Sequence, residues 1–467
     1  MTGCAMAFVF GGRISAMRLV RSITYASATI AGIWLCWHIS IRAADSTPLF
    51  DPDPQHISNR LYRELHVRSD PGGKEYGFDT LDPLLWQETK YLLSGKSYGR
   101  ALSLADEFLR THAERQISDP TKRAILQRDV WAVFDWADEP DPAHFQSERR
   151  ELMARLAVIV RRLALSPDQL ARLPDTYARA LENHEFPGKF DPASPNQAFL
   201  PPELVDPSGP WVCLGVPEQG LAAPLHDLSF APRSVFFVFA RLPAGRGATL
   251  EYFKLLAELK IPLFLRSEVP GRSIPFIEWN PQVPQFPAGT EFALVRKMEL
   301  PDPEGRLHLT PVTESARIRH YLDIPNVDPT ASRDLALVRR FQAPSEIELS
   351  RILLFSEGHS GLRGVTASDD PFLIFPAMSH GFDELEDQRL NRLPLSPFVA
   401  CTSCRHGPGT QSMMSFSFRG NPYYGPVLSP RLAETTPLEE TEKVIGWAQR
   451  QDKWKDLLRL WSSDNPK

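Results

Sequence analysis

Residues 292–310 read FALVRKMELPDPEGRLHLT, two runs of mixed apolar and polar residues on either side of a short turn. The first run covers residues 292–300, the second covers 306–310, and the sequence PDPEG lies between them. Proline and glycine in a short connection between two such runs are typical of a β-hairpin. The stretch therefore predicts two antiparallel strands, and it decides the fold class of this part of the chain.

The sequence on both sides of this hairpin predicts further strands. Residues 235–239 read VFFVF, a run typical of a buried strand. Residues 316–322 and 347–353 alternate apolar with polar side chains, which is typical of half-buried antiparallel strands. We therefore expect a mainly antiparallel β (α+β) domain over residues 191–395. His308 and His320 fall within these strands, and we expect them to be polar-face residues rather than ligands.

The sequence before the strands, residues 45–190, predicts a helical domain. Apolar residues recur at spacings of three and four over residues 121–137 and over 152–163, and Asp119 with Pro120 is a start signal. The sequence SPDQ at 166–169 is a capping box with proline at the first helical position. Pro174 predicts a break in the helix that follows and runs to about residue 183.

The C-terminal sequence predicts an amphipathic helix over residues 436–461. TPLE at 436–439 is a second capping box. The apolar stripe of this helix, which we expect to pack on the protein's own core, consists of Val444, Trp447, Trp454, Leu457, Leu458 and Trp461. The fold class is therefore α+β: a helical N-terminal domain, a mainly antiparallel β domain, and a segment, 396–467, with a CxxC loop and the C-terminal helix.

Composition excludes several classes of protein. The chain has 467 residues, 42% hydrophobic and 23% charged, as in an ordinary folded protein and unlike a disordered chain or a multi-span membrane protein. Its net charge of -5 argues against a general nucleic-acid partner. Proline accounts for 43 residues, well above the usual share of about 5%. Such a density of proline favours loops and edge strands over long helices.

The first 44 residues resemble a targeting segment. Arg18 and Arg21 precede an apolar stretch over 23–37, and Ala43 and Ala44 supply the small residues of a cleavage site. We expect a signal peptide cleaved near Ala44 and export to the periplasm or cell envelope. The alternative is an uncleaved N-terminal anchor, because the run from 23 to 41 is almost long enough to span a membrane. We expect no further membrane-spanning segment.

The sequence CTSCRH at 401–406 suggests a cofactor, with Cys401, Cys404 and His406 as the candidate binding residues. It resembles the C-x-x-C-H signature of covalent c-type haem, in which two thiols attach the haem and the adjacent histidine binds the iron. Here Arg405 occupies the ligand position, and a guanidinium has no lone pair to offer iron. The pattern is therefore a degenerate haem c motif, and we expect no cofactor rather than haem.

Other roles for this motif remain open. The two cysteines can form a disulfide in an oxidising compartment, act as a redox dithiol beside the basic Arg405 and His406, or contribute to a zinc site. Three cysteines would remain after cleavage, too few for a disulfide scaffold. Candidate second axial ligands of a haem are Met378, His380, Met413 and Met414. We expect methionines to serve mainly as packing residues.

Two weaker patterns complete the search for chemistry. Gly245-Arg246-Gly247 follows a predicted strand and precedes a predicted helix, but it lacks the rest of a phosphate-binding motif, so we expect a tight turn. The acidic cluster Asp383, Glu384 and Glu386 lies near His380 in sequence, and we expect a solvated turn there. The sequence has no H-E-x-x-H or Walker A motif.

Three stretches carry a resemblance to a group of uncharacterised exported bacterial proteins with a single C-x-x-C-H motif. They are LALSPDQLARLPDTY at 163–177, SVFFVFARL with its PAGR turn at 234–246, and the 401–409 loop. The resemblance implies an envelope location and a haem-bearing ancestor, but no activity. We therefore expect an exported cell-envelope protein, non-enzymatic, with a degenerate cytochrome-c-like CxxC motif. The alternative is a c-type haem electron carrier or a dithiol redox protein.

Overall fold

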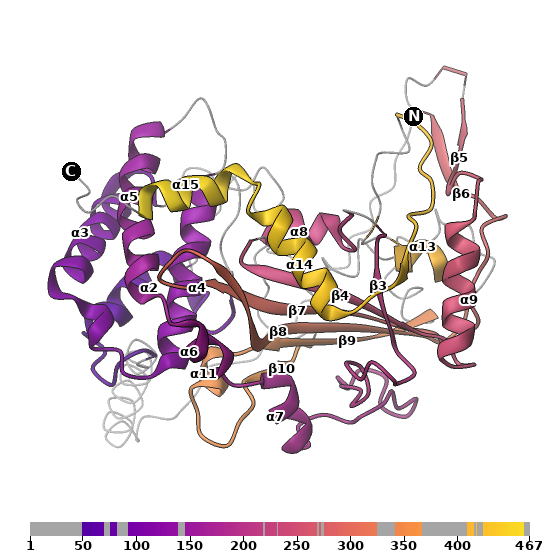
Figure 1. The fold of residues 1–467 in the computed structure, drawn as a ribbon, viewed down its shortest axis with the longest axis horizontal. Coiled ribbons are helices and arrows are strands. Elements are labelled where there is room, and N and C mark those ends of the chain that lie inside the picture. Colours follow the sequence, from indigo (N-terminus) through magenta and orange to yellow (C-terminus); the bar gives the residue numbers. More distant parts are fainter. Residues whose placement is uncertain are drawn as a thin grey trace, which may run out of the picture. The chain divides into compact units, whose positions relative to one another are not determined.

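The computed structural model describes most of the chain after residue 48. The described residues are 49–69, 75–81, 92–138, 145–217, 220–230, 232–268, 270–271, 275–324, 341–366, 409–414, 417 and 424–461. All of them belong to one compact unit, Leu49–Lys467. The fold class is α+β, as the sequence predicts, with helices first and a mainly antiparallel sheet after them (Figure 1).

The first segment is helical. Its helices are α2 (Ile57–His66), α3 (Gly95–Thr111), α4 (Pro120–Ala137), α5 (Gln146–Leu163), α6 (Pro167–Ala171) and α7 (Thr176–Glu182). The predicted start of α4 is confirmed, because the Asp119 carboxylate accepts hydrogen bonds from the first-turn amides. The capping box of Ser166 and Gln169 is also confirmed at α6. The predicted break at Pro174 separates α6 from α7.

A seven-stranded antiparallel sheet follows, in the order β10-β9-β8-β7-β4-β3-β11. Its strands are β3 (Val212–Gly215), β4 (Ser234–Arg241), β7 (Glu291–Pro301), β8 (Leu307–Tyr321), β9 (Gln342–Leu349), β10 (Leu362–Gly364) and β11 (Ala433–Glu434). The predicted hairpin is confirmed by the pairing of Pro301 with Leu307. Gly305 in its turn has a φ of 76°, a conformation that glycine adopts at little cost. Two short hairpins lie outside this sheet: β1 (Arg68–Ser69) with β2 (Glu75–Tyr76), and β5 (Phe264–Ser267) with β6 (Phe276–Trp279).

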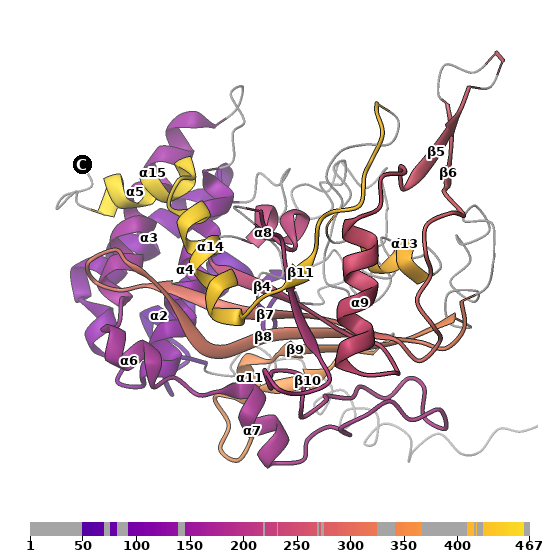
Figure 2. The same cartoon turned by 45° about the vertical axis from the view of Figure 1, so that its right-hand side comes forward.

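Both faces of the large sheet are buried, in two separate apolar clusters. Val235 and Phe237 belong to the cluster that contains the apolar residues of α4 and α5. Phe236 and Val238 belong to the cluster that contains Phe253 of α9 (Arg246–Ala257) and the methionines of α13 (Gly409–Met414). Figures 1 and 2 show the long strands running from the α4 and α5 end to the end where α9 and α13 lie.

The structure corrects two predictions about the strands. β8 is not half-buried, because Arg319 and Tyr321 on its second face are only 2% and 1% exposed. The strand predicted over 347–353 ends at Leu349, and helix α11 (Arg351–Leu354) follows. Ser350 caps this helix by accepting a hydrogen bond from the Leu353 amide, so the polar residue that continued the alternation is a helix start instead.

The C-terminal helix is two helices, α14 (Pro437–Ala448) and α15 (Asp452–Trp461), so the prediction of one continuous helix is wrong. The capping box of Thr436 and Glu439 is confirmed. The apolar stripe packs on the protein's own core, as predicted, with Trp454, Leu457 and Trp461 buried in the cluster shared by α4 and α5. Among the residues that the structure describes, no helix has the length and apolar character needed to cross a membrane.

Candidate functional site

The predicted cofactor residues Cys401, Cys404 and His406 lie outside the described residues, as do Arg405, Met378, His380, Asp383, Glu384 and Glu386. The described chain resumes at Gly409, the last residue of the motif's Gly-Pro-Gly sequence. α13 is therefore the described element that follows the motif directly. It lies beside α9 over one face of the sheet (Figure 2).

The first residues of α13 are tied to α9 and to the loop before β7. The Thr410 amide donates to Gln285 Oε1 at 2.9 Å, and the Thr410 hydroxyl donates to the Pro284 carbonyl at 2.9 Å. The same hydroxyl lies 2.6 Å from the Tyr252 hydroxyl of α9. Gly409 has a φ of 46°, and a Cβ there would lie 2.2 Å from Gln285 Oε1. The chain leaving the motif is therefore fixed at a position that requires glycine.

The middle of α13 is bound to the sheet by Ser412. Its hydroxyl accepts hydrogen bonds from the Tyr321 hydroxyl of β8 at 3.2 Å and from Gln342 Nε2 of β9 at 3.1 Å. All three side chains are at most 3% exposed. This contact spans two strands, so it sets both the position and the rotation of α13 over the sheet.

The two methionines of α13 are core residues. Met413 and Met414 are 2% and 0% exposed and belong to the apolar cluster of this sheet face. A flexible thioether fills irregular gaps in a core, which is the packing role expected from the sequence. Burial of Tyr252 beside them raises the pKa of its phenol, so this side chain remains a neutral hydrogen-bonding group.

A small cavity lies between α13 and the sheet. Its walls are Val238, Phe292, Ala293, Leu294, Arg319, Tyr321, Ser412 and Met413. Its volume is about 10 Å³, counted as the space open to the centre of a water molecule. Arg319 is 2% exposed, and its Nη2 donates to Glu346 Oε1 at 2.5 Å. Its Nη1 is buried without a hydrogen-bond partner.

The histidines within the strands each pair with a carboxylate of the same hairpin. His308 lies 2.9 Å from Asp302, and His320 lies 2.8 Å from Glu291. Burial pushes the pKa of Asp302 upward, but hydrogen bonds from Arg306 and His308 outweigh it and hold that pKa below its usual value. Phe190 stacks on the His320 ring at 4.3 Å. Among the described residues, no group of three or more His, Cys, Asp or Glu side chains could hold a metal ion.

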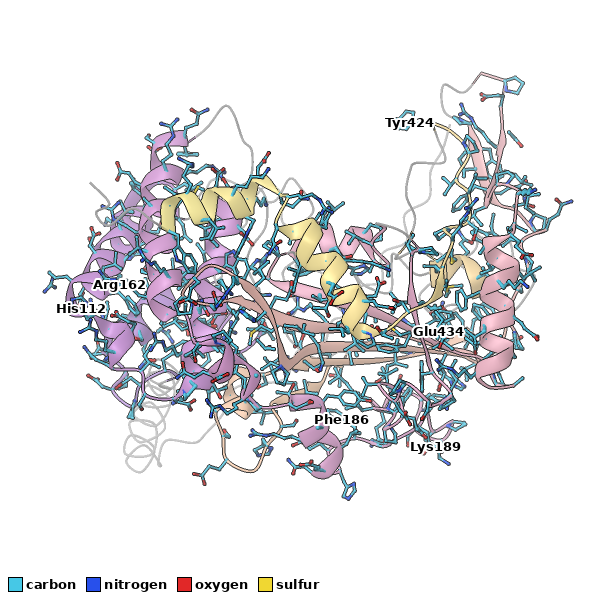
Figure 3. All side chains as sticks on the ribbon, viewed as in Figure 1. His112, Arg162, Phe186, Lys189, Tyr424 and Glu434 are labelled. Atoms are coloured by element: carbon cyan, nitrogen blue, oxygen red, sulfur yellow. The ribbon has the colours of Figure 1, made fainter. Side chains whose placement is uncertain are left out.

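A surface groove of about 510 Å³ lies where β3 and β11 meet the start of α14. Glu434, labelled in Figure 3, lines it and forms an ion pair with Arg246. Gly245 of the Gly-Arg-Gly sequence is the N-cap of α9, and Arg246 is the first residue of this helix. Arg246 also donates to the carbonyl of Trp211, the residue before β3, at 2.6 Å, so it joins the start of α9 to β11 and to the start of β3. Lys443 donates to Glu440 at 2.7 Å. Two charged side chains of the groove, Glu434 and Lys443, are therefore held in ion pairs with neighbouring residues.

A buried ionic cluster joins α4 to the sheet, and the sequence analysis missed it. Glu314 lies between two guanidinium groups, 2.9 Å from Arg128 Nε and 2.8 Å from Arg296 Nε, and it also accepts a hydrogen bond from Ser234 at 2.6 Å. The three charged side chains are at most 7% exposed. Glu314 falls at a register irregularity, where Ser315 and Thr313 are the paired residues. Because a bulge changes the direction of a side chain, the period of the strand could not reveal it.

Two buried carboxyl groups lie near this cluster. Glu299 of β7 is 0% exposed, and neither of its oxygens has a hydrogen-bond partner. Burial raises the pKa of Glu299 well above its usual value, and the carboxyl groups of Asp227 and Glu314 add to this rise. Burial also raises the pKa of Asp227, in α8 (Pro224–Phe230). Burial therefore favours the uncharged form of both acids. The available signal was the presence of charged residues, Glu299 among them, within a strand of the predicted sheet.

Comparison of the chain with protein-family models, with curated proteins and with solved structures finds no match.

Proposed function

We propose that this chain is an exported, non-enzymatic protein of the cell envelope in which Cys401 and Cys404 form a disulfide rather than hold haem. The observation that carries the proposal is the sequence CTSCRH, which has a cation where a haem-binding motif has its iron ligand. A thiol pair at this spacing can close a short loop in an oxidising compartment. The apolar N-terminal segment supports export to such a compartment.

The packing of α13 supports a structural role for this loop. Thr410 and Ser412 hydrogen-bond to the scaffold, and Met413 and Met414 belong to the core. A disulfide that closes the four-residue loop would restrict the chain entering this anchored helix. In the chain-entropy view, a loop of that length contributes about 2 kcal/mol to the free energy of unfolding.

The enclosed charges of the core support a non-enzymatic protein. Arg128, Glu314 and Arg296 form an ionic cluster buried between α4 and the sheet. They are paired with one another and at most 7% exposed. A catalytic acid or base must reach its substrate, whereas these groups serve the contact between α4 and the sheet.

Intact mass spectrometry of the exported protein, produced in a host able to attach haem, tests this proposal. We expect a chain that begins near Ala44, lacks two hydrogens, and regains them on reduction. The double variant Cys401→Ser with Cys404→Ser is the control and should show no change on reduction. A mass increase of one haem, with the matching absorbance, would support the c-type haem alternative. Fully reduced thiols in the untreated exported protein would contradict the disulfide.

A dithiol redox protein is the second candidate, because Arg405 and His406 are basic neighbours that favour a thiolate. A redox dithiol exchanges readily with small thiols such as glutathione, whereas a structural disulfide resists reduction by them. A redox dithiol should equilibrate with a glutathione buffer in the range of known thiol oxidoreductases, about -120 to -270 mV. A structural disulfide should remain oxidised at potentials down to about -300 mV.

A further inference from the structure

The buried guanidinium of Arg319 is only partly satisfied. Glu346 shares its two oxygens between two arginines: Oε1 lies 2.5 Å from Arg319 Nη2, and Oε2 lies 3.4 Å from Arg317 Nε. Arg319 therefore receives one carboxylate oxygen instead of the two of a bidentate pair. Its Nη1 has no partner, and the side chain is 2% exposed. An unpaired donor on a buried charged group is costly, so its presence needs an explanation.

Arg319 also lines the cavity beneath α13. A small ligand in this cavity could accept a hydrogen bond from Arg319 Nη1. The cavity holds a species of about the size of one water molecule. Val238, Phe292 and Leu294 form apolar walls, while Tyr321 and Ser412 add hydroxyl groups. A buried ligand here is therefore small and hydrogen-bonded mainly to Arg319.

The hydrogen-bond pattern favours an anion over water. The Ser412 hydroxyl accepts from both Tyr321 and Gln342, so both of its lone pairs are used. Arg319 offers only donors. A water molecule needs acceptors for both of its hydrogens, and the Tyr321 oxygen in the lining can serve only one of them, whereas an anion needs donors alone. In a low-dielectric site a charge-assisted hydrogen bond from a guanidinium is stronger than one between neutral groups.

From this geometry we infer a binding site for one monatomic anion of the size of chloride, held by Arg319 Nη1 between β8 and α13. Chloride is only slightly larger than water and has no hydrogens to satisfy. The anion would contact both the sheet and the helix that follows the CxxC loop. Its binding would therefore stabilise the docking of α13, and the site stands whether or not Cys401 and Cys404 form a disulfide.

Thermal unfolding of the full exported chain tests this inference. At constant ionic strength, replacing sodium gluconate with sodium chloride or bromide should raise the unfolding midpoint along a saturating curve, because a ligand that binds only the folded state stabilises it. Gluconate is too large for the cavity. The variant Arg319→Gln should lose this halide-dependent shift. A midpoint that is equal in chloride and gluconate for the wild type would overturn the inference.

A matched control is available on the same sheet. Arg363 of β10 pairs with Glu348 of β9, much as Arg319 of β8 pairs with Glu346 of β9, but Arg363 does not line the cavity. The variant Arg363→Gln should keep the full halide shift. Persistence of the shift in Arg319→Gln would show that halide acts elsewhere and would also overturn the inference.

Crystals of the wild-type protein grown in bromide give a test that does not depend on any variant folding. An anomalous bromide peak within hydrogen-bond distance of Arg319 Nη1 is the expected result. Density for water at that position, with no anomalous signal, would show that the cavity is a hydration site and would reject the anion.

Discussion

The indole rings of Trp131 in α4 and Trp454 in α15 lie 5.7 Å apart, with an angle of 51° between their planes. The two residues are 0% and 3% exposed. Arg161 of α5 donates to the Trp461 carbonyl at 3.0 Å, which holds the last residue of α15 on the same helices. The C-terminal helix is therefore part of the core formed by the first helices of the chain.

We expect Trp454→Ala to lower the free energy of unfolding by about 3–5 kcal/mol, the usual cost of removing a large aromatic side chain from a core. Deletion of residues 436–461 should destabilise the fold further, because it also removes α14. Denaturant titration measures both effects. The exposed neighbour Lys455→Ala is the control and should change the free energy of unfolding by no more than about 0.5 kcal/mol. An unchanged midpoint for the truncated chain would show that the stripe does not support the core.

We expect Gly409→Ala to destabilise the protein by about 1–3 kcal/mol, the cost of holding an ordinary residue in a sparsely populated conformation. The added Cβ would lie 2.2 Å from Gln285 Oε1, which would have to move and release the Thr410 amide. Chemical denaturation is the measurement. Gly425→Ala is the matched control, since no atom lies within 4 Å of a Cβ built there. Equal stability of the two variants would argue against the anchoring of α13 at Gly409.

We expect Glu299→Gln to stabilise the protein above neutral pH. The pKa of Glu299 is higher in the folded state, so between the unfolded value of about 4.3 and the folded value only the unfolded chain loses its proton. Stability therefore falls as pH rises through this window, by up to about 1.4 kcal/mol per pH unit for this group. The nearby carboxyl groups of Asp227 and Glu314 raise the pKa of Glu299 further.

Urea titrations of the wild type and Glu299→Gln from pH 4 to pH 8 check this expectation. The gain in stability should be small near pH 4 and should grow with pH. Glu442→Gln, at an exposed position of α14, is the control and should follow the wild-type profile. A constant difference between Glu299→Gln and the wild type at all pH values would contradict a raised pKa in the folded state.

Deletion of Arg405 places His406 directly after Cys404 and restores the order C-x-x-C-H. If the segment derives from a cytochrome site, we expect this variant to acquire covalent haem in a host that attaches it, while the wild type does not. Absorbance in the Soret region and intact mass report the attachment. A substitution that keeps the spacing, Arg405→Ala, is the control and should remain without haem. A colourless deletion variant would remove the main support for cytochrome ancestry.

The sequence predicted those parts of the fold whose signals are local. The hairpin at 292–310 and the capping boxes at Ser166 and Thr436 each depend on residues a few positions apart, and all three are confirmed. The end of β9 was missed in part because one of the two side-chain contacts that place Ser350 at the start of α11 comes from elsewhere in the chain. Ser350 hydrogen-bonds to Asp79, which precedes α3. The alternation of apolar and polar residues along this strand gives no information about a partner so distant in sequence.

The candidate site was predictable only in part, for the same reason. Alternation along β8 correctly placed Arg319 and Tyr321 on one face, but it assigned that face to solvent. α9 and α13 cover it, and they come from segments well separated from β8 in sequence. The cavity and the unpaired Arg319 Nη1 exist only because of this cover. The motif residues Cys401, Cys404 and His406 stay a prediction from the sequence.

The position of β11 has a consequence for the order of folding. β3 pairs with β4 on one side, and its other side is closed by β11, near the opposite end of the chain. The β7–β8 hairpin can form early because its contacts are local, whereas pairing of β3 with β11 must wait for the C-terminal segment. Until that segment arrives, one edge of β3 leaves its backbone N–H and C=O groups unpaired and open to other chains. Folding intermediates that lack β11 should therefore be the species most prone to aggregate.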